Sequence, residues 1–149
     1  MPNLLLWEDR VLKNIDPILS PDLLHALRAM GHGDEIAIVD ANFPATALAR
    51  RLIRLDGVTV ARAVQAVLSV LPLDDFVDRP AYTMQVVGNP DSVPEAVAQM
   101  RLLIGAADLC GMLERDSFYL RARDCFAILQ TGETLLYGNI ILKKGVIGA

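Results

Sequence analysis

The sequence predicts a single α/β domain in three layers, with helices on both faces of a mostly parallel, mixed sheet. Two observations lead to this prediction. The chain has 149 residues, the length of one domain, and no repeat, low-complexity tract or linker divides it. Segments with apolar residues at helical spacing alternate along the chain with short apolar runs typical of strands. Such an alternation is characteristic of layered α/β folds.

The first helix is expected to begin at Pro21 and to continue to Met30. Ser20 is a good N-cap, and proline suits the first helical position. Gly31 then ends the helix. The next element is a strand over Ile36–Val39, because this run is apolar on both faces and fits the middle of a covered sheet.

The middle of the chain continues the alternation. A short helix is expected over Pro44–Leu52, and a longer helix follows the N-cap Thr59, with valines and leucines along one face. A second strand is expected over Tyr82–Val87. Ser92–Glu95 match a capping box that opens a helix through about Ile104.

The last third of the chain contains further strands. Leu109–Leu113 is expected to be a strand, and Ser117–Asp124 a short helix. Two more strands, Cys125–Gln130 and Leu135–Leu142, are joined around Thr131–Gly132–Glu133.

Composition excludes several classes of protein. Hydrophobic residues make up 53% of the chain and charged residues 21%, which excludes a disordered chain. A net charge of −4 argues against a nucleic-acid-coating protein. No stretch reaches the ~20 apolar residues of a membrane span, and no secretory signal is present. We therefore expect a cytoplasmic protein. Its high mean hydropathy of +0.37 indicates that it buries apolar surface against copies of itself.

Cofactor and metal motifs are missing from the sequence. There is no dinucleotide fingerprint, phosphate loop or nucleophile elbow. The two histidines, His25 and His32, do not have the spacing of metal ligands. Cys110 and Cys125 are expected to be free, buried thiols. We therefore expect no cofactor and no metal.

Two polar residues flank the Ile36–Val39 strand. Asp40 follows it, at the end where α/β sheets bind ligands. His32 precedes it between two glycines, where few side chains cover it. Imidazole titrates near pH ~6.5, so His32 suits an accessible acid/base group. A solvated histidine at a helix C-cap explains the same pattern equally well.

Polar groups also lie in apolar surroundings near the end of the chain. They are Arg115, Tyr119 and the segment Tyr137–Gly138–Asn139. A glycine within a strand indicates a bulge or the close approach of a ligand. On the residues alone, simpler interpretations are favoured: a solvated ion pair for Arg115 and a half-buried strand aromatic for Tyr137.

Several blocks together carry a resemblance to a known family. They are Met30–Ile36, Asp40–Ala45, Ile53–Gly57, Phe118–Tyr119, Phe126–Ala127, Thr131–Glu133 and Tyr137–Val146. In this order they resemble the L-fucose mutarotase / D-ribose pyranase family, from about Val11 to Val146. Residues 1–10 precede the usual family start. We therefore expect an N-terminal extension over 1–10 and one sugar mutarotase-like domain over 11–149.

The resemblance implies a role for each matching residue. It makes His32 the proton donor, Asp40 a sugar ligand and Arg115 a contact to sugar hydroxyls. It places Tyr137 and Asn139 in the lining of the pocket, with Tyr119 as a less certain member. Arg115 favours the fucose branch, because the ribose branch more often has histidine there. The partner base stays open between Asp40 and Tyr137.

The implied activity is the interconversion of α and β anomers of L-fucose or a related monosaccharide by acid/base-assisted ring opening. The resemblance further implies a ring-shaped homo-oligomer, expected to be a decamer, with pockets near the subunit contacts. Two alternatives stay open. One is a D-ribose pyranase, and the other is a sugar-binding oligomer without catalysis.

Overall fold

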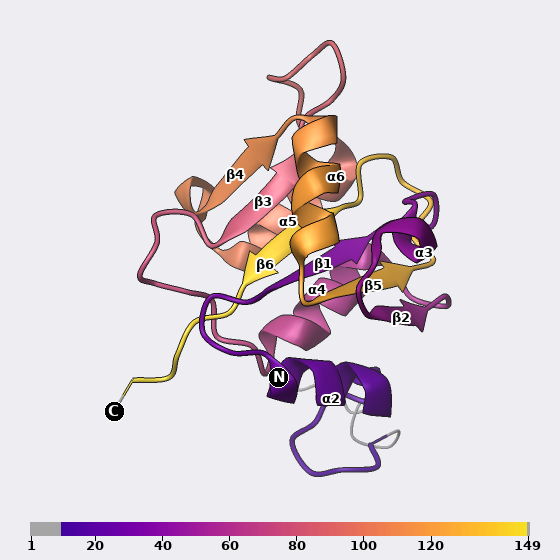
Figure 1. The fold of residues 1–149 in the computed structure, drawn as a ribbon, viewed down its shortest axis with the longest axis vertical. Coiled ribbons are helices and arrows are strands. Elements are labelled where there is room, and N and C mark those ends of the chain that lie inside the picture. The colour runs from indigo at the N-terminus through magenta and orange to yellow at the C-terminus, as the bar shows by residue number, and fades with distance from the viewer. Residues whose placement is uncertain (1–9, 149) are drawn as a thin grey trace.

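A computed structural model describes residues 10–148 and has the predicted three layers (Figure 1). Its strands are β1 (Glu35–Val39), β2 (Leu52–Leu55), β3 (Ala81–Met84), β4 (Cys110–Leu113), β5 (Ala127–Thr131) and β6 (Ile140–Lys143). They form one sheet in the order β2-β5-β1-β6-β3-β4. Strand β6 runs antiparallel to β1 and β3, and the other neighbouring strands are parallel. The mostly parallel, mixed sheet is therefore confirmed.

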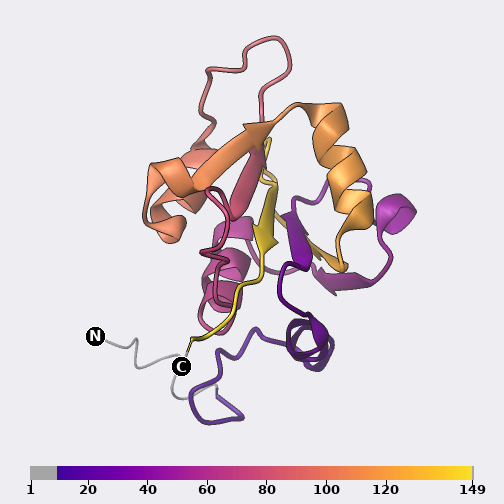
Figure 2. The ribbon, with the colours of Figure 1, turned by 60° about the vertical axis from the view of Figure 1, so that its left-hand side comes forward.

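Helices cover both faces of this sheet. They are α2 (Pro21–Ala29), α3 (Ala45–Leu48), α4 (Val60–Leu68), α5 (Glu95–Ile104) and α6 (Arg115–Asp124), with a 3₁₀ turn, η1 (Ala107–Leu109). Helices α2, α4 and α5 share one core cluster, and α3 and α6 pack in the other. Figure 2 shows α4 and α6 on opposite sides of the strands.

Strand β1 lies in the middle of the sheet because it is apolar in both directions. Ile36 and Ile38 point into the cluster under α4, whereas Ala37 and Val39 point into the cluster under α6. All four side chains are fully buried. The interpretation of Ile36–Val39 as a covered central strand is confirmed.

The helix caps are only partly as predicted. Ser20 Oγ accepts a hydrogen bond from Leu23 N–H at 3.3 Å, and Thr59 Oγ1 accepts one from Arg62 N–H at 3.2 Å. The capping box at Ser92–Glu95 is wrong. Helix α5 begins at Glu95, with Pro94 as an N-cap that makes no side-chain hydrogen bond.

The helix expected over Pro44–Leu52 is much shorter than predicted. It covers Ala45–Leu48, and residues Leu52–Leu55 form strand β2 instead. In this strand only Ile53 is buried, where it pairs with Leu129 of β5. A four-residue edge strand with one buried position has too little alternation to be distinguished from a helix.

The last two strands follow one another in sequence but do not pair. Strand β1 lies between β5 and β6, so the connection crosses over the end of β1. Strand β6 begins at Ile140 rather than Leu135, and Leu135–Asn139 form an irregular turn. The strand expected over Tyr82–Val87 ends at Met84, and the other elements differ from expectation only at their ends.

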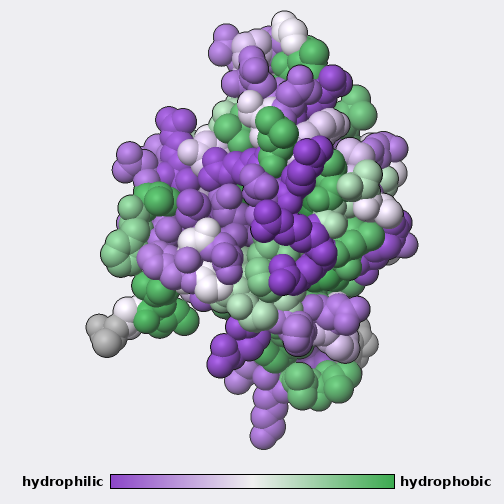
Figure 3. Space-filling model, viewed as in Figure 1, coloured by the Kyte–Doolittle hydropathy of each residue, from purple (hydrophilic) through white to green (hydrophobic). Residues whose placement is uncertain are grey.

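Other predictions concern the surface and the thiols. Cys110 and Cys125 are free and buried, as expected. Within residues 10–148, no helix is long and apolar enough to span a bilayer. In Figure 3, hydrophilic side chains gather over α6 and hydrophobic ones lie in separate patches around it. The extension predicted over 1–10 lies outside the described residues except for Arg10, and stays a prediction.

Gly132 permits a close backbone crossing just after β5. A Cβ at this position would overlap the carbonyl oxygen of Asp56, whereas a Cβ at Gly57 would meet no atom within 4 Å. We expect Gly132→Ala to lower the free energy of unfolding by at least about 2 kcal/mol, because backbone must move. The matched control Gly57→Ala should change it by less than about 0.5 kcal/mol. Urea unfolding measures both, and equal effects would contradict the prediction.

Candidate functional site

A cavity of about 220 Å³ lies at the edge of the sheet where β1 and β3 end. Its lining comes from the segment after β1, the start of α6 and the turn before β6. It brings together all the predicted substrate-binding residues: Asp40, Arg115, Tyr119, Tyr137 and Asn139. Sequence reasoning did not identify the remaining lining residues, which are Asn42, Phe43, Met84, Val87 and Leu136.

Asp40 is the buried carboxylate of this cavity, with 6% of its surface exposed. Its Oδ1 accepts a hydrogen bond from Asn42 N–H at 3.0 Å, and its own N–H donates to Asn139 Oδ1 at 2.9 Å. Burial raises the pKa of Asp40, and hydrogen bonds from the loop oppose this rise only in part. A buried carboxyl group with a raised pKa keeps its proton to a higher pH than a free aspartate, which suits a group that exchanges protons.

Tyr137 has an unusual backbone conformation, with φ of 61°. A tyrosine in the left-handed region carries strain, and such strain is often found at functional sites. The Tyr137 hydroxyl accepts a hydrogen bond from Val87 N–H at 3.1 Å, so its own proton is free to be donated elsewhere. The next residue must be glycine, because a Cβ at Gly138 would lie 2.9 Å from Glu133 Cγ.

Glu133 organises the turn that carries Tyr137. Its buried carboxylate accepts hydrogen bonds from Thr134 N–H at 3.0 Å and Leu135 N–H at 3.2 Å. Its carbonyl oxygen accepts from Ala41 N–H at 2.9 Å, in the segment after β1. Glu133 therefore joins the two segments that line the cavity. Sequence reasoning treated it only as part of a connection.

Arg115 and Tyr119 reach the cavity from the first two turns of α6. Arg115 Nε lies 3.7 Å from Asp116 Oδ1, so the solvated ion pair suggested by the sequence is present. Both partners are exposed, and pairs of this kind hold a side chain weakly. The guanidinium also lines the cavity. The Tyr119 ring packs edge-on against Phe43, with centroids 5.2 Å apart.

His32 lies at the other end of β1. It precedes this strand, whereas Asp40 follows it. The five residues of β1 alone span about 16 Å, several times the ~3 Å reach of a hydrogen bond. Within one chain, the structure therefore brings together the predicted sugar ligands but not the predicted proton donor.

His32 has its own buried partner. Its Nε2 lies 3.0 Å from Asp74 Oδ1, and its ring packs against Phe76 with centroids 5.0 Å apart. The hydrogen bond with His32 lowers the pKa of Asp74, so the carboxylate is ionised and orients the imidazole. Asp74 was missed because it lies 42 residues away in an irregular segment, and no spacing rule connects the two.

Two further features bear on the chemistry of the molecule. Among residues 10–148, no group of three or more His, Cys, Asp or Glu side chains could hold a metal ion. A larger cavity, of about 560 Å³, lies between α2, the end of α4 and the C-terminal segment. Among its described lining residues the charged ones are Arg28 and Lys144, and none of them is a carboxylate or an imidazole suited to proton transfer.

Comparison with solved structures supports the same fold. The fucose mutarotase of Streptococcus pneumoniae in complex with L-fucose matches with a TM-score of 0.86 and 44% identity, over 92% of this chain and 100% of that one. RbsD of Bacillus subtilis complexed with D-ribose matches with a TM-score of 0.70 and 22% identity, over 88% and 96%. At that identity the second likeness shows the fold alone.

Sequence comparison gives the family. The L-fucose mutarotase of Glaesserella parasuis is 45% identical over 141 residues, covering 91% of this chain and 96% of that protein. The fucose mutarotase of Homo sapiens is 42% identical over 145 residues, covering 91% and 94%. The model of the RbsD / FucU transport protein family matches residues 13–147. On these matches and the geometry above, the chain belongs to the RbsD / FucU family.

Proposed function

We propose that this protein is a monosaccharide mutarotase, an isomerase that interconverts the α and β anomers of L-fucose or a closely related sugar. One observation carries the proposal: a buried carboxylate, an arginine, an amide and two tyrosines line one cavity of about 220 Å³. The cavity is smaller than the ~300–1,000 Å³ of drug-sized sites, which suits a single small sugar. The names of the relatives at 42–45% identity support the same activity.

The reaction needs only proton transfer. A base removes the proton of the anomeric hydroxyl, an acid protonates the ring oxygen, and the bond between the anomeric carbon and that oxygen breaks. The open aldehyde then rotates and closes on its other face. Positioned acids and bases typically contribute on the order of 10²–10⁴-fold to such steps. Within the cavity, Asp40 and the hydroxyls of Tyr137 and Tyr119 are groups that can exchange a proton, and Asp40 and Tyr137 are the two expected to do so.

The remaining polar groups orient the sugar. Asn139 Oδ1 accepts from Asp40 N–H, which turns its NH₂ toward the Asp40 carboxyl group, where a hydrogen bond from Asn139 opposes the rise of the Asp40 pKa. An amide NH₂ has two protons, so the second can donate to a sugar hydroxyl. The Arg115 guanidinium carries only donors and forms charge-assisted hydrogen bonds with hydroxyl oxygens. These contacts hold the anomeric centre beside the Asp40 carboxylate.

His32 joins the site in this proposal through a second copy of the chain. An exposed apolar side chain lies near each end of β1, where it is available for contact with a second copy of the chain. Phe76, beside His32, is 71% exposed, and Leu136, beside the cavity, is 70% exposed. A head-to-tail contact would cover both and place one copy's His32 against the next copy's cavity. Repeated head-to-tail contacts close into rings, which agrees with the expected ring-shaped decamer.

Exchange NMR at equilibrium tests the activity directly. We expect the protein to enhance magnetisation transfer between the α and β anomers of L-fucose, and His32→Ala to reduce it at least about 100-fold with the fold intact. His25→Ala is the matched control, because His25 is an exposed histidine on α2, away from both the cavity and the contact between His32 and Asp74. Binding of L-fucose without enhanced transfer would favour the non-catalytic alternative. Enhancement with D-ribose alone, including its furanose signals, would favour the pyranase.

Mixed oligomers test whether two copies share one site. His32→Ala and Asp40→Asn chains should each be nearly inactive alone. When they are co-expressed with different tags, random assembly should restore about a quarter of the wild-type sites. No recovery in oligomers shown to contain both chains would mean that His32 and Asp40 do not act across a contact.

A cytoplasmic location also stays part of this proposal.

The pKa of Asp40 gives a stability prediction. Because burial raises it, the ionised carboxylate costs the folded state free energy at pH values above the folded pKa. Below the unfolded pKa of ~3.9 the carboxyl is protonated in both states and this cost vanishes. We expect Asp40→Asn to become increasingly stable relative to wild type as pH rises from 4 to 7, while L-fucose binding weakens but stays measurable at high sugar concentration. Urea unfolding at several pH values measures this trend, and a variant less stable at pH 7 than at pH 4, relative to wild type, would contradict it.

A further inference from the structure

Gln130 is a buried amide on β5, the strand next to the edge of the sheet, with 5% of its surface exposed. It lies near the end of β5, between Val39 of β1 on one side and Arg54 of β2 on the other. Buried polar groups in a sheet are costly unless every hydrogen-bonding atom finds a partner. The hydrogen-bond partners of this amide therefore identify the segments that it holds in place.

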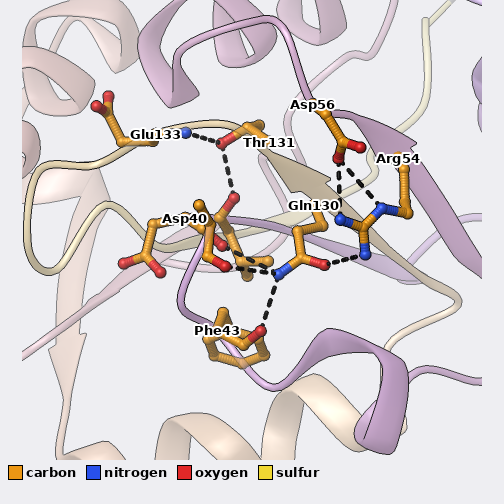
Figure 4. Close-up of polar contacts among 9 residues, drawn as sticks. Asp40, Phe43, Arg54, Asp56, Gln130, Thr131 and Glu133 are labelled. Carbon is orange, nitrogen blue, oxygen red and sulfur yellow. Dashed lines mark hydrogen bonds and ion pairs between the residues drawn. The ribbon is translucent and has the colours of Figure 1, made fainter.

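Both ends of the Gln130 amide are occupied (Figure 4). Its Nε2 donates to Phe43 O at 2.9 Å and lies 3.4 Å from the carbonyl oxygens of Asp40 and Ala41. Its Oε1 accepts from Arg54 Nη1 at 2.9 Å. A guanidinium only donates and carbonyl oxygens only accept, so this arrangement allows one orientation of the amide and not the flipped one.

Arg54 is itself held in place by a contact on the protein surface. It is 51% exposed on the edge strand, and its Nε donates to Asp56 Oδ1 at 3.1 Å. Neither Arg54 nor Gln130 lines the cavity. A chain of contacts thus runs from an exposed sheet edge, through the buried amide, to the backbone of the segment that carries Asp40.

We propose that Gln130, oriented by Arg54, is a positioning residue that sets the affinity of the site for its sugar. Its amide fixes the carbonyls of residues 40, 41 and 43, and so fixes the direction in which the Asp40 carboxylate faces the cavity. The inference rests on the proposed function, since it assigns Asp40 to the sugar. It adds a determinant of affinity that lies outside the cavity.

The test uses the assembled full-length protein and two substitutions. Gln130→Met keeps the length of the side chain but removes the donor, and Arg54→Met removes only the group that orients the amide. We expect KM for L-fucose anomer exchange to rise about tenfold in Gln130→Met and about threefold in Arg54→Met. Because Asp40 also exchanges a proton, kcat should fall too, but by less than KM rises, and the shape of its pH profile should stay that of wild type.

Two comparisons separate positioning from general stability. Arg50→Met is the matched control, because Arg50 is an exposed arginine with an exposed aspartate partner, Asp124, and should leave KM unchanged. In an Asp40→Asn background, Gln130→Met should no longer weaken L-fucose binding measured by chemical-shift titration. A purely structural role would lower the unfolding midpoint without this non-additivity.

The outcomes distinguish the inference from the proposed function. An unchanged KM in Gln130→Met and Arg54→Met overturns the positioning role, while loss of activity in Asp40→Asn keeps the function. Unchanged anomer exchange in Asp40→Asn overturns both. If Gln130→Met does not fold, the exposed Arg54→Met still decides, because a wild-type KM in that variant contradicts the inference.

Discussion

The site depends on one constraint: the segment after β1 and the turn before β6 must be fixed against each other across the edge of the sheet. Strand β1 pairs with β5 on one side and β6 on the other, and its last residue, Val39, pairs with Gln130 of β5. Two hydrogen bonds then join the segment after β1 to the segment before β6: Ala41 N–H donates to Glu133 O, and Asp40 N–H donates to Asn139 Oδ1. A buried carboxylate can keep its direction only on such a support.

The arrangement has a cost in stability that its function explains. Asp40 is buried, which disfavours its charged form, and Tyr137 is held in a left-handed backbone conformation. Neither feature helps the chain to fold, and both lie on the same cavity. Their cost is offset by the fully apolar layers on either side of β1. Proteins commonly trade stability for function at such sites.

The sequence predicts the layers and half of the residues that line the cavity, for identifiable reasons. An apolar four-residue run such as Ile36–Val39 identifies a covered strand, and a carboxylate directly after it marks the ligand-binding edge. The resemblance to a known family then placed Arg115, Tyr119, Tyr137 and Asn139 near it. Periodicity failed where an element is short, as in the edge strand Leu52–Leu55.

Contacts made by irregular segments were beyond prediction. Asp74 meets His32 across 42 residues, and Gln130 reads in sequence as one polar residue at the end of an apolar run. Neither has a spacing signature, because the contact is set by how loops pass over the sheet. Sequence order also hides that His32 and Asp40, eight positions apart, lie at opposite ends of a strand.

Because His32 and Asp40 lie at opposite ends of β1, the number of complete sites depends on how copies of the chain assemble. If every site needs the His32 end of one copy and the Asp40 end of its neighbour, an open chain of copies has one complete site fewer than it has copies. The two terminal copies each have one end without a neighbour, so Phe76 stays exposed on one of them and Leu136 on the other. In a closed ring every copy has two neighbours. Ring closure would therefore complete the last site and cover the last exposed apolar side chains in the same step.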